Sequence, residues 1–443
     1  MPSDINKPVF HITLFEKQLV RSYLLSDQGY LIQHLLAFFQ VNIITSRELE
    51  SLIFKKLSEL GIHSSVSITI FEEYRENLGL RVLSSMLRFG NKSLNTVLVI
   101  NLQKSLGSGF LRTLIRYSIY FVVSNSSIVK MLLRKLYYLL LNSTNVSECF
   151  SPKIIIKQND VLFITSLCPL RGEDIPIGIF FKKHKIKILG TVRSWDNLLV
   201  NGSLLFLPDI FLSHSEYMFE TIVHKQGFKR NRVLPFITLS YQDKFFTNKI
   251  ENINRVTTNI NFSYMCQGLV SNPDDENFVS WLINEWSKMP KNFNLYVVQH
   301  PSFIMNNFTS NLPSNVRFVV FKYEQTTLLD YYSHLSQMDL VLGGGTTALL
   351  DASFLDVPIV AVEFEIVEQH FWRSALRHFD YCPWTADFFN FSKIQRAKNK
   401  KELINYILNY QQITKLDKAI VKRFTGDPEI NPAKVILTAL QSY

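Results

Sequence analysis

Several features are scarce or missing in this chain of 443 residues. Its four cysteines lie far apart without a CxxC pair, so we expect no zinc knuckle or disulfide framework, and a reducing compartment fits. The N-terminus has no basic segment followed by an apolar one, so we expect no signal peptide. The most apolar region, 110–141, is interrupted by Arg, Lys and Asn. It does not reach the run of about 20 apolar residues that a membrane span needs.

Acidic residues are missing from one long segment. The net charge is +10, yet residues 77–147 contain no Asp or Glu and nine Lys or Arg residues. Within it, 107–141 spaces its basic residues about a helical turn apart among Leu, Ile, Tyr and Phe, as on an amphipathic surface helix or helix pair. Contact with an anionic membrane surface and basic side chains lying over a buried helix face both fit this pattern. Nucleic acid is not an expected partner, because no nucleic-acid-binding signature accompanies the charge.

Strand-like apolar runs alternate with helical periods along most of the chain, which predicts an α/β fold with largely parallel sheets. Expected strands are 9–15, 41–45, 66–71, 96–101, 161–165, 186–191, 259–266, 295–299, 316–321, 340–342 and 359–364. The apolar signal fades near 239–257, which predicts a boundary there. We therefore expect an N-terminal Rossmann-like domain over 1–238, a second one over 239–400 facing it across a cleft, and a helical tail over 401–443.

The strongest local motif is a glycine turn between an apolar strand and an apolar helix. Gly343, Gly344 and Gly345 would let a ligand approach the backbone closely, and Thr346 and Thr347 would begin the helix, where N–H groups favour a phosphate. Asp351, about one turn further, could reach a ribose or sugar hydroxyl. The alternative is an ordinary strand-to-helix turn in which one Thr caps the helix. The turn is neither a Walker A loop nor a spaced GxGxxG.

His300 and Pro301 follow another strand of the same half. Ligands of open α/β sheets bind outside the carboxyl ends of the strands, so His300 and Thr346 could face one crevice, where a His can donate to a phosphate or neutralise a leaving group. A loop histidine beside a turn-forming proline is the alternative.

A third cluster follows a strand of the first half and consists of Arg193, Ser194, Trp195, Asp196 and Asn197. Such side chains suit a substrate-facing loop, in which Asp196 could act as general base on an acceptor hydroxyl and Arg193 could bind an anion. Asp196 or Asn197 could instead cap a turn. Rival carboxylates are Glu173 and Asp174, which could equally lie in the first turn of a helix.

The GGGTTALLDA turn, the Val357-Pro358 that follows it and the upstream His300-Pro301 together resemble the donor domain of two-domain GT-B glycosyltransferases. The pattern is similar to bacterial surface-polysaccharide enzymes, including sialyl- and Kdo-transferases and CDP-glycerol glycerophosphotransferases, and the RSWDN stretch resembles one in transferases of this kind. Gly172-Glu173-Asp174 departs from the acidic-acidic-Gly motif of the sialyltransferases.

The resemblance implies a metal-independent transfer of sugar from a CMP-, CDP- or UDP-linked donor to a surface glycan, which could be lipid-linked. His300, Thr346 and Thr347 would hold the donor phosphate, with Pro301 and the three glycines of the turn beside it. Asp351 would contact the sugar or ribose, and Asp196 would be the base. No further cofactor is implied. For such an enzyme we expect a cytoplasmic location, which could be at the inner face of the plasma membrane. Sugar-nucleotide 2-epimerisation, glycerol-phosphate transfer and a non-catalytic binding protein remain open alternatives.

Overall fold

The structure is a computed structural model of the full chain. It describes residues 7–24, 30–72, 74, 76–89, 97, 100–101, 103–104, 107–142, 144–167, 174–192, 198, 204–224, 226–236, 259–268, 272–301, 303–305, 312–322, 325–326, 328–370, 373–380 and 382–441. The chain divides into two compact units. The first comprises Met1–Ile100, Gly109–Gln242 and Gly426–Tyr443, and the second comprises Asn101–Ser108 and Asp243–Thr425.

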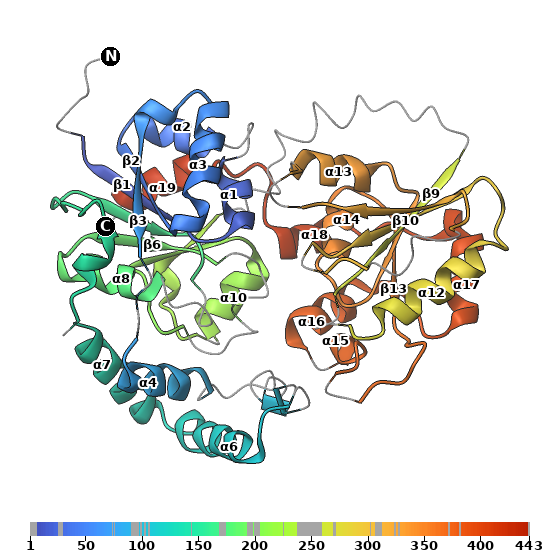
Figure 1. The fold of residues 1–443 in the computed structure, drawn as a ribbon, viewed down its shortest axis with the longest axis horizontal. Helices are drawn as coiled ribbons and strands as arrows, with labels where there is room; N and C mark the ends of the chain where they lie inside the picture. The colour runs from blue at the N-terminus through green and yellow to red at the C-terminus, as the bar shows by residue number, and fades with distance from the viewer. Residues whose placement is uncertain are drawn as a thin grey trace. The chain divides into compact units, whose positions relative to one another are not determined.

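An eight-stranded sheet forms the centre of the first unit (Figure 1). Its spatial order is β4-β3-β2-β1-β5-β6-β7-β8, and every pair is parallel except β3 with β4. The strands are β1 (Val9–Leu14), β2 (Gln40–Thr45), β3 (Val66–Phe71), β4 (Phe150–Ser151), β5 (Val161–Ile164), β6 (Lys187–Gly190), β7 (Ile210–Ser213) and β8 (Val233–Pro235).

Helices cover both faces of this sheet, as expected when parallel strands are joined by helical crossovers. On one face, Phe10, Ile12, Val41 and Ile43 pack with helices from both ends of the chain. The helices of the unit are α1 (Lys17–Leu24), α2 (Tyr30–Leu36), α3 (Arg47–Glu59), α4 (Leu78–Phe89), α6 (Phe110–Ser124), α7 (Ser127–Asn142), α8 (Asp174–Lys183), α10 (Glu216–His224) and α19 (Pro432–Gln441).

The second unit is built on a six-stranded, all-parallel sheet with the order β11-β10-β9-β12-β13-β14. Its strands are β9 (Ile260–Met265), β10 (Phe293–Gln299), β11 (Val316–Val320), β12 (Leu340–Gly343), β13 (Ile359–Val362) and β14 (Gln395–Ala397). Its helices are α12 (Asp275–Trp286), α13 (Leu328–Ser336), α14 (Ala348–Phe354), α15 (Arg377–Asp380), α16 (Pro383–Ser392), α17 (Lys400–Leu408) and α18 (Lys418–Thr425). Phe262, Leu295, Leu342 and Trp286 lie in its core.

The C-terminal residues, treated above as one tail, belong to two units. Residues up to Thr425 group with the second unit, and those from Gly426 onward group with the first. There, Ala433, Ile436 and Ala439 of α19 complete the apolar core beside α2. Gly426 has a positive φ of 92°, and a Cβ atom at this position would lie 1.9 Å from the His214 carbonyl oxygen, so only glycine fits where the chain returns.

The α/β class with two parallel-sheet units is confirmed, but one expected strand is wrong. The apolar run 96–101 was expected to be a strand, whereas Val97, Ile100 and Asn101 are helical. A short apolar run fits a buried helix as well as a strand, and Ile100 is fully buried.

Candidate functional site

The order of the second sheet defines where a ligand would bind in that unit. β9 leads to β10 and β11 on one side, and β12 returns to pair with the other side of β9. Open parallel sheets bind ligands outside the carboxyl ends of the strands at such a reversal point. The residues that follow β9 and β12 here are Cys266–Gly268 and Gly344–Thr346, so the predicted glycine turn lies at the reversal point.

Three of the loops at this edge touch one another. A Cβ atom at Gly344 would lie 2.4 Å from Gln267 Oε1, and a Cβ atom at Gly268 would lie 3.4 Å from His300 Cγ. Gln267 and Gly268 therefore join His300, which follows β10, to the glycine turn, which follows β12. The buried Oε1 of Gln267 has no hydrogen-bond partner within the described part of the chain.

His300 is half-buried in this cluster, and Pro301 follows it in a turn. Burial lowers the pKa of His300, because the charged imidazolium loses water contact. Near neutral pH the ring is therefore neutral, with one nitrogen as donor and the other as acceptor. A neutral donor of this kind can hydrogen-bond a phosphate oxygen.

Asp275 fixes the loop that carries Gln267 and Gly268. Its fully buried carboxylate accepts hydrogen bonds from the Tyr264 hydroxyl at 2.9 Å, the Gln267 and Gly268 backbone N–H groups at 2.7 and 2.9 Å, and Asn272 Nδ2 at 2.9 Å. Burial raises the pKa of Asp275 to about 6, although these hydrogen bonds oppose the shift. The carboxylate is thus saturated with partners and acts as an anchor for the loop.

Two further carboxylates hold the loop after β13. Asp274 accepts the backbone N–H groups of Ile366 and Val367, and Glu365 accepts those of Ala375 at 2.8 Å and Gln369 at 3.1 Å. The edge loops of this unit are therefore held by hydrogen bonds to carboxylates, which are stronger than those between neutral groups.

Neighbouring side chains leave little space for a side chain at the glycine turn. A Cβ atom at Gly345 would lie 2.2 Å from His378 Cβ, and one at Gly343 would lie 3.1 Å from Thr346 Cγ2. Side chains of this chain thus already approach the turn closely. Thr346 Oγ1 accepts the Ala348 N–H at 3.3 Å, which is the capping role considered above, while Thr347 makes no side-chain cap hydrogen bond.

Asp351 lies in the first turn of α14, where Oδ2 accepts a hydrogen bond from the Tyr331 hydroxyl of α13 at 2.9 Å. The carboxylate thereby joins two neighbouring helices of the second unit.

The first sheet has the same reversal point, between β1 and β5. There Ser166 Oγ donates to Glu16 Oε1 at 3.3 Å, and both side chains are buried. Further along the same edge, Thr191 Oγ1 donates to the Leu212 carbonyl and lies 2.8 Å from His214 Nε2. Burial lowers the pKa of His214 to about 3, so this ring is neutral.

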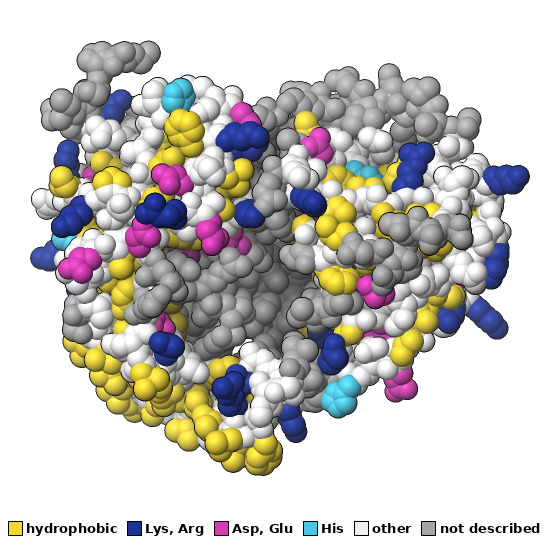
Figure 2. Space-filling model, in the orientation of Figure 1, with side chains coloured by type: hydrophobic (Ala, Val, Ile, Leu, Met, Phe, Trp, Pro, Cys, Tyr) yellow, Lys and Arg dark blue, Asp and Glu magenta, His cyan; other side chains and the backbone are white. Residues whose placement is uncertain are grey.

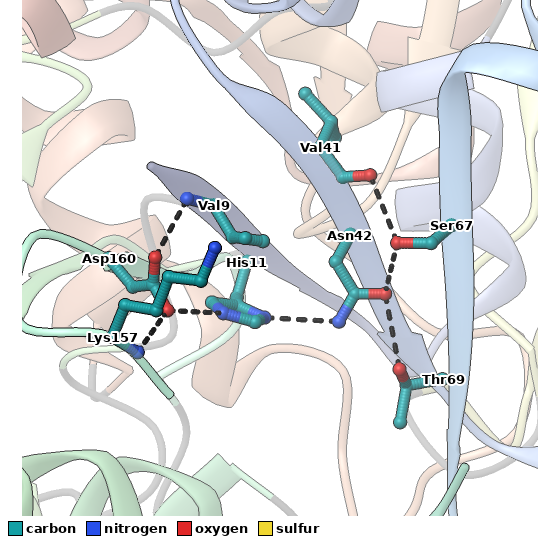
Figure 3. Close-up of polar contacts among 8 residues, drawn as sticks. All are labelled: Val9, His11, Val41, Asn42, Ser67, Thr69, Lys157 and Asp160. Atoms are coloured by element: carbon teal, nitrogen blue, oxygen red, sulfur yellow. Dashed lines mark hydrogen bonds and ion pairs between the residues drawn. The ribbon is translucent and has the colours of Figure 1, made fainter. Parts of the chain in front are cut away.

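A polar row crosses the interior of the first sheet (Figure 3). Asn42 of β2 lies 3.0 Å from His11 Nδ1 of β1 and accepts hydrogen bonds from Ser67 and Thr69 of β3 at 3.0 and 3.1 Å. His11 Nε2 lies 3.8 Å from Asp160 Oδ2. Burial alone would raise the pKa of Asp160, but hydrogen bonds from His11 and from the Lys157 and Val9 N–H groups lower it overall. The row joins three strands and the start of a fourth.

Most of the acceptor-side residues predicted from the sequence are not among those that the structure describes. Arg193, Ser194, Trp195, Asp196, Asn197 and Glu173 lie outside the described residues. Asp174 is the first residue of α8 and is buried. Of the residues predicted for the donor side, the structure brings His300 and the glycine turn to one edge.

Among the described residues, no group of three or more His, Cys, Asp or Glu side chains could hold a metal ion. Within the same described residues, no helix is long and apolar enough to cross a bilayer.

Solved structures with a similar fold include two UDP-GlcNAc 2-epimerases. The UDP-GlcNAc 2-epimerase of Methanocaldococcus jannaschii, in complex with UDP-GlcNAc and UDP, is 12% identical with a TM-score of 0.50, covering 98% of this chain and 100% of its own. The UDP-GlcNAc 2-epimerase of Neisseria meningitidis, bound to UDP-GlcNAc, is 11% identical with a TM-score of 0.50 and the same coverage. No protein-family model and no curated protein matches the chain.

The fold is therefore that of the GT-B class, in which two Rossmann-like units are joined in one chain. At this level of identity the likeness defines the fold and not the reaction.

Sequence reasoning missed Gln267, Asp275, His378 and Glu16. Gln267 and Glu16 each lie two residues after the end of a strand, so strand ends at the reversal points were the signal that could have found them. His378 is 33 residues from Gly345 and carries no local signal.

Proposed function

We propose that this protein is a nucleotide-sugar-dependent glycosyltransferase whose donor binds at the carboxyl edge of the second sheet. The observation that carries the proposal is the cluster of His300, Gln267 and the glycine turn at the reversal point of that sheet. It offers a neutral histidine and an amide oxygen without a described partner, both beside the backbone of the loops at this edge. Polar groups of this kind fit a nucleoside diphosphate or monophosphate better than an apolar ligand.

In the proposed reaction the acceptor hydroxyl loses its proton to a carboxylate, its oxygen attacks the anomeric carbon, and the bond to the donor phosphate breaks. His300, beside Pro301, and the backbone of Gly343, Gly344 and Gly345 would stabilise the charge that develops on the departing phosphate. Thr346 and Thr347 would add hydroxyl contacts, and Asp351 would contact the sugar or ribose. No metal and no further cofactor take part in this scheme.

The proposed general base is Asp196, with Arg193, Ser194, Trp195 and Asn197 binding the acceptor. Glu173 and Asp174 are rival carboxylates from the sequence, and Glu16 is a third because it is buried at the reversal point of the first sheet. Asp196→Asn should lower turnover at least about a hundredfold with unchanged nucleotide affinity. The same loss in Glu16→Gln, with Asp196→Asn still active, would move the role to Glu16.

The acceptor that fits is a surface glycan, and the acid-free segment 77–147 favours one carried on an anionic lipid. Cys149, Cys266 and Cys382 are free thiols, which supports a cytoplasmic location at the inner face of the plasma membrane.

A second candidate is sugar-nucleotide 2-epimerisation, favoured by the likeness in fold to UDP-GlcNAc 2-epimerases. Glycerol-phosphate transfer on the same fold is a related reaction. Incubation with a labelled donor separates these outcomes, because a transferase moves label to the acceptor, whereas an epimerase returns a labelled nucleotide sugar without acceptor.

The first test is a thermal-shift screen over CMP, CDP, UDP and GDP, followed by calorimetry with the nucleotide that binds. The double variant Thr346→Ala/Thr347→Ala should weaken binding about tenfold or more, since hydrogen bonds to a charged phosphate are lost. Thr414→Ala, an exposed threonine of the same unit, is the matched control. Unchanged affinity in the double variant would remove these threonines from the site. No binding of any nucleotide would favour a non-catalytic protein.

A further inference from the structure

The helices α6 and α7 carry their apolar side chains on the outside. The most exposed positions of α6 include Leu111, Leu114, Ile115, Phe121 and Val122, which are 49–70% exposed. The buried positions of the same helix include the polar Thr113 and Ser124. A surface helix of a globular protein ordinarily does the reverse, so α6 presents its apolar face to something other than its own core.

α7 continues the same surface. Ile128, Met131, Leu132, Leu136 and Leu139 are 46–67% exposed and recur at spacings of three, one, four and three residues, which places them along one face. Figure 2 shows the hydrophobic side chains gathered over α6 and α7. We call these ten residues of the two helices the apolar stripe.

The charged residues that α6 and α7 themselves carry are all Arg or Lys. Arg112 and Lys135 are exposed on the same helices, and the segment 77–147 that contains both helices has no carboxylate. The Arg134 guanidinium donates a hydrogen bond to the Leu204 carbonyl at 3.3 Å. Arg116 Cζ lies 5.3 Å from the centre of the Phe89 ring. Arg112 and Lys135 are therefore the cations best placed to meet a partner beside the apolar stripe.

We propose that the apolar stripe docks on an anionic lipid bilayer, with its side chains in the interface and Arg112 and Lys135 at the headgroups. A bilayer accepts apolar side chains and supplies negative charge along one plane, which matches both properties of the surface. A second copy of this chain fits less well, because a symmetric contact would bring the same cations together without a carboxylate from this segment.

The two helices that carry the apolar stripe are too short to be membrane spans. α6 has 15 residues and α7 has 16, so neither is long enough to cross the hydrocarbon core. Both helices would lie in the plane of the interface, and the first unit would approach the bilayer through these two helices. An enzyme bound in this way would meet a lipid-linked acceptor by diffusion within the plane of the membrane.

Flotation of the full chain with lipid vesicles tests the proposal. We expect binding to phosphatidylcholine vesicles containing about one third phosphatidylglycerol, and weaker binding to phosphatidylcholine alone. Leu114→Ser/Phe121→Ser/Leu132→Ser should lower the partition coefficient at least about tenfold, because three apolar side chains leave the interface. The matched control is Phe54→Ser/Ile155→Ser/Leu408→Ser, which changes side chains that are 50–82% exposed elsewhere and should bind as the wild type does.

The charge contribution is tested separately. Arg112→Gln/Lys135→Gln should weaken binding to the anionic vesicles about fivefold for each charge removed and should leave binding to phosphatidylcholine unchanged. Lys55→Gln/Lys291→Gln, two exposed lysines elsewhere, is the control and should retain binding.

Three results would overturn the proposal. One is a wild type that does not float with anionic vesicles, and another is a control triple variant that loses as much binding as the stripe variant. The third is a wild-type dimer in light scattering that the stripe variant converts to a monomer, which would assign the stripe to a second copy. Lipid binding does not depend on the proposed reaction, so calorimetry with nucleotide is run on the same proteins without vesicles. Lost nucleotide binding with retained flotation would contradict the transferase and leave the docking surface standing.

Discussion

The two sheets follow the same winding but place their polar side chains differently. In both, the strands run outward from a central strand, return to its other side and run outward again. The first sheet buries a polar row within its strands, from Asp160 through His11 and Asn42. The second sheet concentrates its carboxylates at the loops of its carboxyl edge, where Asp274, Asp275 and Glu365 accept backbone N–H groups.

The two sheets therefore use buried polar side chains for two different purposes. Asn42 contacts both neighbouring strands at once, so it favours one register of β1, β2 and β3. Asp275 contacts the loop beyond the strand and sets the position of Gln267 and Gly268. The first unit thus uses polar side chains for strand pairing, and the second uses them to order the edge where we propose the donor binds.

The largest expected effect is at the anchor of the second unit. Asp275→Ala leaves four donors without their acceptor in a fully buried place, so we expect the free energy of unfolding to fall by about 4 kcal/mol. Chemical denaturation followed by tryptophan fluorescence measures this, with Ser280→Ala on the exposed side of α12 as control. A loss below about 1 kcal/mol would show that Asp275 does not hold the loop.

The same carboxylate predicts a pH dependence of the opposite sign to that of Asp160. The folded pKa of Asp275, about 6, is raised above its ordinary value, so its protonated form stabilises the folded state below about pH 4 and this stability is lost as pH rises through 6. The pKa of Asp160 is lowered, so its contribution is present above about pH 4 and is lost in acid.

Hydrogen exchange between pH 4 and 7 separates the two units, because peptides from each sheet report independently. Relative to Asp275→Asn, the wild type should lose about 2 kcal/mol of protection in the second sheet over this range. Equal pH profiles for the wild type and Asp275→Asn would contradict the raised pKa.

A smaller loss is expected within the first sheet. Asn42→Ala removes the partner of His11, Ser67 and Thr69, and we expect about 2 kcal/mol of destabilisation. Ser67→Ala should cost less than about 1 kcal/mol, because Ser67 is exposed and Thr69 still donates to Asn42. Thermal unfolding of the two variants side by side measures the ratio, and equal losses would mean that Asn42 does not connect the strands.

Effects well below that of Asp275→Ala are also expected at the glycine turn. Gly345→Ala meets the Cβ atom of His378, which cannot move without its backbone, and should cost about 1–2 kcal/mol. Gly344→Ala meets only the end of the Gln267 side chain, which can rotate away, so its cost should be smaller. Denaturation midpoints rank the two, and a reversed ranking would contradict the packing described for the turn.

The sequence predicts the long apolar strands of both units well, because hydrophobic runs bounded by polar residues mark buried parallel strands. It misses β4, β8 and β14, which have two, three and three residues and give too short a run. It also misses the four-residue strand β7. The apolar run 96–101 contains β-branched residues typical of a strand, yet Val97, Ile100 and Asn101 are helical, since a buried helix tolerates the same residues.

The candidate site is partly visible in sequence. The glycine turn and His300 both follow strands, and strand ends converge on one edge of a sheet. Which side chains fill the turn could not be read, because His378 and Gln267 reach Gly345 and Gly344 only through tertiary packing. Asp351 shows the same limit, since its partner Tyr331 lies on a preceding helix.

The return of the chain to the first unit has a consequence for protein synthesis. Helix α19 supplies Ala433, Ile436 and Ala439 to a core whose other members begin at Phe10. A nascent chain therefore cannot close this core until residues 432–441 have left the ribosome, although the second unit, whose residues end at Thr425, is already complete. The N-terminal half is synthesised first and finishes folding last, in contrast to the usual order of domain folding during translation.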